Sequence, residues 1–181
     1  SLDGYVVDAD GDFSWAAPTA EVHAAVNDLE RPLATQLLGR RMYEVLAFWE
    51  DPDPASLSDV EREYARIWQD TDKVVYSSTL PEVATARTRL ERRFDPEAVA
   101  ALVARSEGPV GIGGPTLAAE AFRAGLVDEV HLFLVPHTVG GGTPALPPGQ
   151  HVRLHLEDVR SHDGGVVHLH HRVVHEQAPV V

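Results

Sequence analysis

Three short segments of the chain combine small residues with donors that could hold an anionic ligand. In the first, GIGGPT, Gly113 and Gly114 follow an apolar run and Pro115 opens an expected helix. Proline at the first helical position loses only an amide that would have no acceptor in the helix. The amides of Thr116 and Leu117 would then point out of the helix start, where a phosphate could accept from them. A tight strand-to-helix turn without a ligand explains the two glycines about equally well.

The second segment is LLGRRMYE, in which Gly39 ends an expected strand and a helix starts with Arg40, Arg41 and Met42. Cations in the first turn oppose the helix dipole at a cost of ~0.3–1 kcal/mol each. A bound phosphate would reverse the sign of that interaction. Solvated surface arginines are the alternative interpretation.

The third segment is VVYSS, which places the hydroxyls of Ser77 and Ser78 directly after a buried type of strand. Open α/β sheets bind ligands outside the carboxyl ends of their strands. Three strand ends of this kind, two of them leading into helices, could hold two phosphate groups. The sequence therefore predicts a dinucleotide site.

The composition limits the classes of protein to consider. With 181 residues, 44% hydrophobic and 24% charged, the chain fits one globular domain over residues 1–181. A net charge of −13 argues against a nucleic-acid partner. The absence of cysteine excludes disulfides and thiolate sites and suits a reducing cytoplasm. No apolar run approaches the ~18 residues of a membrane span, so we expect a cytoplasmic protein with no membrane partner.

Helical and strand patterns alternate along most of the chain, which predicts an α/β fold with a mostly parallel central sheet flanked by helices and a C-terminal antiparallel hairpin. The uncharged run PVGI is expected to be a central strand of that sheet. Expected helices cover residues 18–30, 40–48, 59–69, a segment opened by Asp95-Pro96-Glu97, and 115–124. Expected strands cover residues 34–38, 73–78, 88–94, 109–112, 129–135, 151–160 and 166–174, the last two joined by HDGG.

The order of SLDGY, LLGRRMYE, VVYSS, VGIGGPTLAAEAF, DEVHLFLVP and VGGGTPAL, followed by the hairpin, resembles the dihydrofolate reductase-like superfamily. Within it, the chain is most similar to stand-alone bacterial proteins related to the reductase domain of riboflavin biosynthesis. The resemblance spans nearly the whole chain. It implies an eight-stranded, mainly parallel sheet with NADPH along its carboxyl edge.

The resemblance also implies roles for the three segments. Arg40 and Arg41 would face the 2′-phosphate of NADPH, Ser77 and Ser78 would border the adenine ribose, and the residues 113–117 would cradle the pyrophosphate. The family usually has threonine or serine where Met42 stands, so a hydroxyl contact is missing. The strand that usually precedes SLDG is also absent, and we expect it to be missing from the record.

Candidate catalytic residues are fewer, because the nicotinamide supplies the hydride and proton delivery needs a carboxylate or only water. The first helix offers Glu21 and Asp28, of which we select Glu21; a solvated helix face is the alternative. Asp3 lies in the turn that would border the nicotinamide, although aspartate before glycine is common in turns. Trp15 is expected to wall the substrate pocket or to pack in the core. The glycine run 139–143 would be a flexible segment over the ligand or an ordinary crossover.

Histidines are concentrated near the C-terminus, where His168 and His170 would share one face of a strand. Two histidines alone could bind a metal ion. No acidic ligand stands beside them in the sequence, and a solvent-facing hairpin explains the alternation more simply. We therefore expect no metal site.

The function expected from the sequence is an NADPH-dependent reductase that transfers a hydride to a small pterin or pyrimidine-like heterocycle. It would be of the dihydrofolate reductase or 5-amino-6-(5-phosphoribosylamino)uracil reductase type and would form a homodimer. A fused zinc deaminase is excluded because its cysteine ligands cannot exist in this chain. The alternative is a protein that binds NADP(H) without turnover, as a sensor or interaction module.

Overall fold

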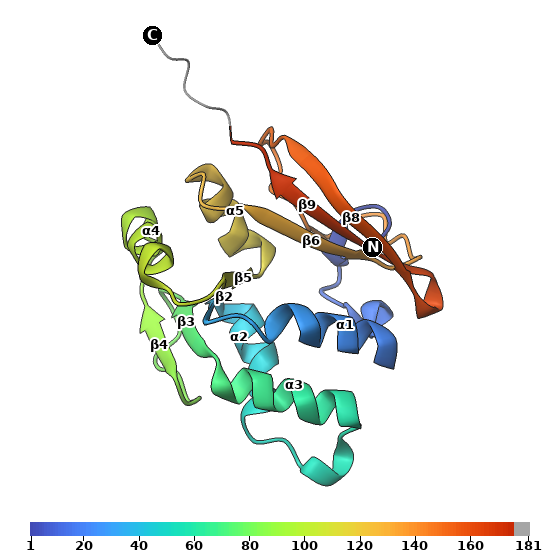
Figure 1. Cartoon of the computed structure of the whole chain (residues 1–181), viewed down its shortest axis with the longest axis horizontal. Coiled ribbons are helices and arrows are strands. Elements are labelled where there is room, and N and C mark those ends of the chain that lie inside the picture. The colour runs from blue at the N-terminus through green and yellow to red at the C-terminus, as the bar shows by residue number, and fades with distance from the viewer. Residues whose placement is uncertain (176–181) are drawn as a thin grey trace. The chain divides into compact units, whose positions relative to one another are not determined.

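A computed structural model describes residues 1–175 of the chain, whose helices and strands are labelled in Figure 1. The chain divides into two compact units. One comprises residues 20–120, and the other combines residues 1–19 with the chain from residue 121 onward. The single domain over residues 1–181 stays a prediction. No helix within residues 1–175 is both long and apolar enough to cross a membrane.

The unit of residues 20–120 is built on a four-stranded parallel sheet in the order β4-β3-β2-β5. Leu38 of β2 and Val75 of β3 meet Tyr43 and Trp68 in its core, where Trp68 and Val75 are 0% exposed. The largely apolar segments of β2 and β3 form the inner strands of the sheet, because strands of this kind are covered on both faces. The strands are β2 (Thr35–Gly39), β3 (Asp72–Tyr76), β4 (Thr88–Glu91) and β5 (Val110–Gly113).

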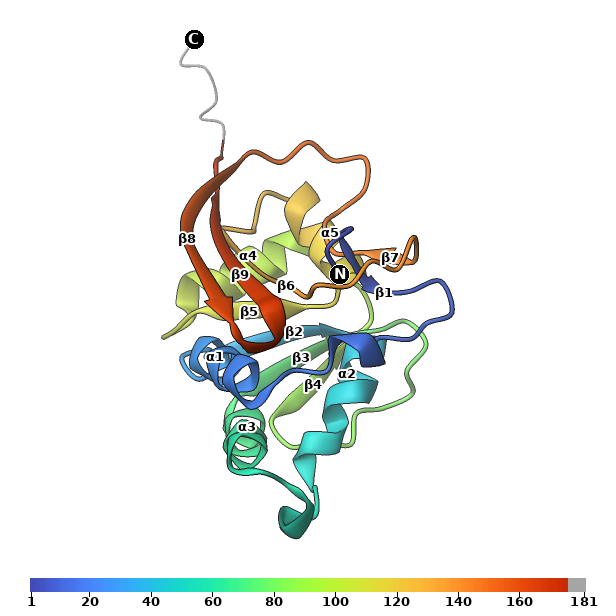
Figure 2. The ribbon, with the colours of Figure 1, turned by 90° about the vertical axis from the view of Figure 1, so that its right-hand side faces the viewer.

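The helices of this unit begin at the residues that the capping signals predict. Ser58 and Glu61 form a complete capping box at the start of α3, and the Asp95 side chain accepts from the amides of Glu97 and Ala98 at the start of α4. Helices α1 and α3 lie side by side (Figures 1 and 2), and Asn27 of α1 donates to the Val60 carbonyl at 2.9 Å. The helices are α1 (Ala20–Glu30), α2 (Arg40–Leu46), α3 (Asp59–Asp70), α4 (Pro96–Arg105) and α5 (Pro115–Arg123), with 3₁₀ turns η2 (Ala47–Glu50) and η3 (Pro54–Ser56).

Two expectations about the sheet are wrong. Strand β5 was expected at the centre, but within residues 1–175 it pairs only with β2 and stands at the end of the sheet order. Its four residues are all partly exposed, whereas three residues each of β2 and β3 are buried. Parallel pairing is confined to these four strands, so the described residues do not form one eight-stranded, mainly parallel sheet.

The second unit is antiparallel. Strand β6 was expected to extend the parallel sheet, but it pairs antiparallel with β9, which in turn pairs with β8 (Figure 2). The predicted hairpin is confirmed, and its turn contains Gly164 and Gly165 at φ 73° and 74°. A short pair, β1 with β7, was not expected. The elements are β1 (Tyr5–Val7), η1 (Ser14–Ala16), β6 (Glu129–Leu134), β7 (Thr143–Pro144), β8 (Leu154–His162), η4 (Asp163–Gly165) and β9 (Val166–Val173).

Candidate functional site

The parallel register brings the three predicted segments to one edge of the sheet. Gly39, the last residue of β2, stands opposite Tyr76, the last residue of β3. On the other side of β2, Leu38 stands opposite Gly113, the last residue of β5. We call this the carboxyl edge. It contains every residue predicted to bind the cofactor: Gly39, Arg40, Arg41, Met42, Ser77, Ser78, Gly113, Gly114, Pro115, Thr116 and Leu117.

The start of α5 lies directly against the end of β2. A Cβ placed on Gly39 would stand 3.9 Å from the Cβ of Leu117. The first backbone bond of this helix runs from the Ala118 amide to the Gly114 carbonyl at 3.0 Å. The amides of Thr116 and Leu117 precede it and have no acceptor within the helix. Leu117 is buried and Thr116 is exposed, so the helix start has one face in the core and one toward solvent.

The two glycines of this turn have local structural reasons to be glycine. A Cβ on Gly113 would lie 3.2 Å from Leu38 Cδ2 and 3.3 Å from Met42 Cγ, which is tighter than normal packing. Gly114 has a φ of 95°, a conformation that residues with a Cβ rarely adopt. Packing and backbone conformation therefore account for the motif without a ligand. Approach of a pyrophosphate to this turn stays a prediction.

The two arginines differ in how their side chains are engaged. Arg40 donates through Nε to Glu44 Oε1 at 2.7 Å and through a terminal nitrogen to Thr79 Oγ1 at 2.9 Å. Arg41 is exposed, and its guanidinium forms no ion pair or hydrogen bond with any side chain of residues 1–175. Arg40 is thus oriented across the edge toward the segment after β3, while Arg41 is available to an anion.

The two serines after β3 differ in burial and in hydrogen bonding. Ser77 is buried, and its Oγ accepts from the amides of Thr79 at 3.3 Å and Leu80 at 2.9 Å, so it shapes the turn. Ser78 is exposed. Thr79, whose hydroxyl accepts from Arg40, was not predicted from the sequence. Its place directly after two serines at a strand end was the signal that could have found it.

Asp3 is hydrogen-bonded to the glycine run 139–143. Its carboxylate accepts from the amides of Val139 at 3.1 Å and Gly140 at 2.7 Å. Hydrogen bonds from Ser1 and then from Gly140 lower the pKa of this exposed carboxyl to about 2. Asp3 is therefore ionised at neutral pH, which suits a positioning role and not proton donation. Gly142 packs so closely that a Cβ there would lie 2.0 Å from the Val7 carbonyl oxygen.

The remaining candidates are Trp15, Glu21 and Asp28. Trp15 is partly buried in η1, and its Nε1 donates to the Asp12 carbonyl at 3.2 Å. Glu21 is exposed in the first turn of α1. Asp28 is paired with Arg31 at 2.7 Å. The roles of Trp15 and Glu21 stay predictions.

The expectation that no carboxylate lies beside the C-terminal histidines is wrong. Glu129 of β6 places Oε2 3.2 Å from Nε2 of His170. Glu129 and His131 alternate along β6 and could have been recognised as sharing a face. Their register against β9 is a long-range property that the sequence did not reveal.

Three comparisons bear on this arrangement. The model of the RibD C-terminal domain family matches residues 1–168. The uncharacterised protein YyaP of Bacillus subtilis is 25% identical over 175 residues, which cover 93% of this chain and 88% of YyaP.

Solved structures share the fold at low sequence identity. A putative riboflavin biosynthesis protein from Shewanella sp. PV-4 superposes with a TM-score of 0.74 at 18% identity, covering 96% of this chain and 94% of that one. A pyrimidine reductase-like protein from Corynebacterium diphtheriae gives a TM-score of 0.66 at 16% identity, covering 97% and 89%. Because the family model spans nearly all described residues, the chain belongs to the RibD C-terminal domain family, with its dihydrofolate reductase-like fold.

Proposed function

We propose that this protein is an NADPH-dependent reductase that transfers a hydride to a small heterocycle of the pterin or pyrimidine type. Membership of the RibD C-terminal domain family supports a reductase of the riboflavin-pathway kind. The observation that carries the proposal is the carboxyl edge, where an unengaged guanidinium and the start of α5 flank the end of β2. Leu117 stands 3.9 Å from the Cβ position of Gly39, so both features border one strand end.

The donors of the carboxyl edge fit an anionic dinucleotide. A protein of net charge −13 repels polyanions in general and must grip phosphates locally. The amides of Thr116 and Leu117, the Thr116 hydroxyl and the guanidinium groups of Arg40 and Arg41 are all donors, and guanidinium matches phosphate oxygens in pairs. These residues would hold the pyrophosphate and the 2′-phosphate.

Arg41 is the residue we assign to the 2′-phosphate, because its side chain is exposed and unengaged. Arg40 would join it at the expense of its pair with Glu44. That pair is about half exposed on both sides, at 48% and 44%. Exposed pairs of this kind contribute about 0–1 kcal/mol, so a phosphate can displace Glu44. Ser78 is the hydroxyl assigned to the ribose, since the Ser77 hydroxyl already accepts from two amides.

The bound cofactor would supply the hydride, so the side chains need only position groups and move one proton. We assign Asp3 to positioning, because its carboxylate fixes the amides of Val139 and Gly140. Glu21 or a water molecule would deliver the proton. Trp15 would contact the substrate ring.

The proposal is tested by turnover. The purified protein is incubated with NADPH and a panel of pterins, aminouracils and quinones, and loss of reduced nicotinamide absorbance is followed. We expect oxidation with at least one pterin or aminouracil, and a rise in the KM for NADPH in Arg41→Ala. Tight NADPH binding without oxidation by any compound would favour a non-catalytic NADP(H)-binding protein.

A further inference from the structure

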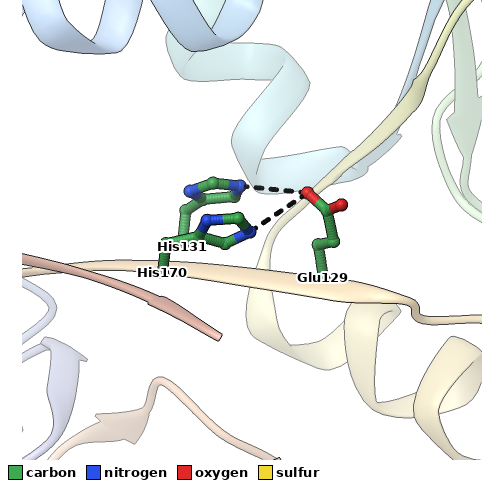
Figure 3. Close-up of side chains that lie close together, drawn as sticks. All are labelled: Glu129, His131 and His170. Atoms are coloured by element: carbon green, nitrogen blue, oxygen red, sulfur yellow. Dashed lines mark ion pairs between the residues drawn. The ribbon is translucent and has the colours of Figure 1, made fainter. Parts of the chain in front are cut away.

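One face of the antiparallel sheet gathers imidazoles and a carboxylate at the pairing of β6 with β9. His131 stands directly opposite His170 in the register, and Phe133 stands opposite His168. Glu129 precedes His131 by two residues and therefore points to the same face. Figure 3 shows the two imidazole rings side by side with the Glu129 carboxylate in front of both. We call Glu129, His131 and His170 the histidine–glutamate cluster.

The ligand atoms of this cluster converge. Glu129 Oε2 lies 3.2 Å from His170 Nε2 and 3.6 Å from His131 Nε2, and all three atoms lie within 4.8 Å of one another. Around a tetrahedral zinc ion with ligand bonds of about 2.0–2.2 Å, neighbouring ligand atoms stand about 3.3–3.6 Å apart. The two imidazole rings stack at 4.2 Å and 12°, and their loosely restricted χ2 torsions allow each nitrogen to turn toward a shared ion.

The cluster leaves one nitrogen unsatisfied. Nε2 of His170 is inaccessible to solvent and has no hydrogen-bond partner within residues 1–175, although the Glu129 oxygen lies only 3.2 Å away. The two atoms are near, but their directions do not suit a hydrogen bond. Buried polar atoms are rarely left without a partner. Ligands of one metal ion stand in this relation, because their lone pairs point to the ion and not to each other.

His168, which lies outside the cluster, contacts His131 and orients its ring. His131 Nδ1 lies 3.0 Å from Nε2 of His168, which is 8% exposed and stacks on Phe133 at 4.3 Å. At this distance Nε2 of His168 can accept a hydrogen bond from the tautomer of His131 that carries its proton on Nδ1. That tautomer has its lone pair on Nε2, the nitrogen that lies 3.6 Å from Glu129 Oε2. Metal-binding histidines usually have such a partner on the second ring nitrogen.

The cations nearest in the register do not neutralise Glu129. Arg172 stands opposite Glu129, but its Nε pairs with Glu157 at 2.7 Å. Arg160 stands opposite His168, and its Nε pairs with Asp158 at 2.7 Å. The ion pairs of Glu129 within the described residues are therefore those with His131 and His170.

We propose that Glu129, His131 and His170 bind a first-row divalent metal ion, with Zn²⁺ as the best match to two imidazoles and one carboxylate. The side chains are 60%, 29% and 25% exposed in that order, and a water molecule would complete the coordination of the ion. The site joins two strands of the same sheet and is expected to stabilise their pairing. This inference does not depend on the proposed reductase function.

The test is metal titration of the full chain, purified without an affinity tag and freed of metal with a chelator. Zn²⁺ is titrated by calorimetry and Co²⁺ by visible absorption. We expect one equivalent of each and a higher melting temperature with Zn²⁺. His131→Ala and His170→Ala should lower the affinity at least about 100-fold. His168→Phe removes the acceptor of His131 and should lower it about 10–100-fold, with a changed Co²⁺ spectrum.

Two controls keep the result interpretable. His151→Ala removes an exposed histidine outside the cluster and should leave the affinity within about twofold. Circular dichroism of the metal-free variants checks folding, and Glu129→Gln, which preserves the side-chain shape, replaces any alanine variant that fails to fold. Failure of Zn²⁺ and Co²⁺ to bind, or binding that Glu129→Gln and the cluster histidine variants leave unchanged, would overturn the proposal.

Discussion

The carboxyl edge and the segment 139–142 use the same residue types for opposite purposes. At the carboxyl edge, Gly113 and Gly114 fit beside Met42, and the amides of Thr116 and Leu117 precede the first hydrogen bond of the helix that follows. In the segment 139–142, the amides of Val139 and Gly140 are already bound to Asp3, and Gly142 packs against the backbone of Val7. The amides beside the glycines are thus already paired in the segment 139–142, whereas at the carboxyl edge two of them have no acceptor within their helix.

Two carboxyl groups, those of Asp3 and Glu30, differ in the direction in which their surroundings shift the pKa. Asp3 is held by hydrogen bonds that lower its pKa to about 2. Glu30, at the end of α1, is partly buried, and desolvation raises its pKa despite a hydrogen bond from Gln36. The first environment favours the charged form and the second opposes it. Two carboxyl groups that look alike in the sequence thus have their pKa values shifted in opposite directions by their surroundings.

The largest expected effect is that of Gly142→Ala. The added Cβ would lie 2.0 Å from the Val7 oxygen and 2.7 Å from Asp8 Cα, at a φ of 129°. We expect a loss of about 3 kcal/mol or more in the free energy of unfolding, measured by urea denaturation. Gly141→Ala is the matched control, because its Cβ would have no neighbour within 4 Å, and it should change stability by about 0.5 kcal/mol or less. Equal effects of the two substitutions would show that the segment is not held against residues 7–8.

The next effect concerns the carboxyl edge. The double variant Arg40→Ala with Arg41→Ala should weaken NADPH binding about 100-fold, because charge-assisted hydrogen bonds to the 2′-phosphate are lost. NADH binding should change about threefold or less. The double variant Arg66→Ala with Arg105→Ala, at exposed positions of α3 and α4, removes the same charge and is the control for net charge. Equal losses for both coenzymes would mean that these arginines do not distinguish the 2′-phosphate.

The smallest effect is the pH dependence of stability at Glu30. Because its pKa is raised in the fold, the native state holds a proton that the unfolded chain has released between pH 4.5 and the higher native pKa. Stability of the wild-type protein therefore falls as pH rises through that window. Glu30→Gln should raise the melting temperature at neutral pH by about 2–4 °C, the shift that about 1 kcal/mol produces. The gain should vanish as pH falls to about 4.5, and a gain that persists there would contradict a desolvated carboxylate.

Local signals in the sequence predicted the elements well. Capping residues such as Ser58 and Asp95 fix helix starts through contacts within a few residues, and the two glycines of the HDGG turn fix the C-terminal hairpin. The family was also predictable, because it depends on the order of such segments. The three strand ends were correctly placed at one edge, because parallel strands end together.

Long-range pairing was not predictable. The apolar character of PVGI did not reveal that β5 pairs on one side only within the described residues. Alternation along β6 did not reveal its antiparallel register with β9, so Glu129 was not associated with His170. Strands β1 and β7 have three and two residues, too few to show a period.

Calorimetric titration of the protein with NADPH tests the central claim most directly. If the guanidinium of Arg41 holds the 2′-phosphate and the first amides of α5 hold the pyrophosphate of one coenzyme, a single equivalent of NADPH should bind at least about tenfold more tightly than NADH. Absence of measurable association with either coenzyme would contradict the account.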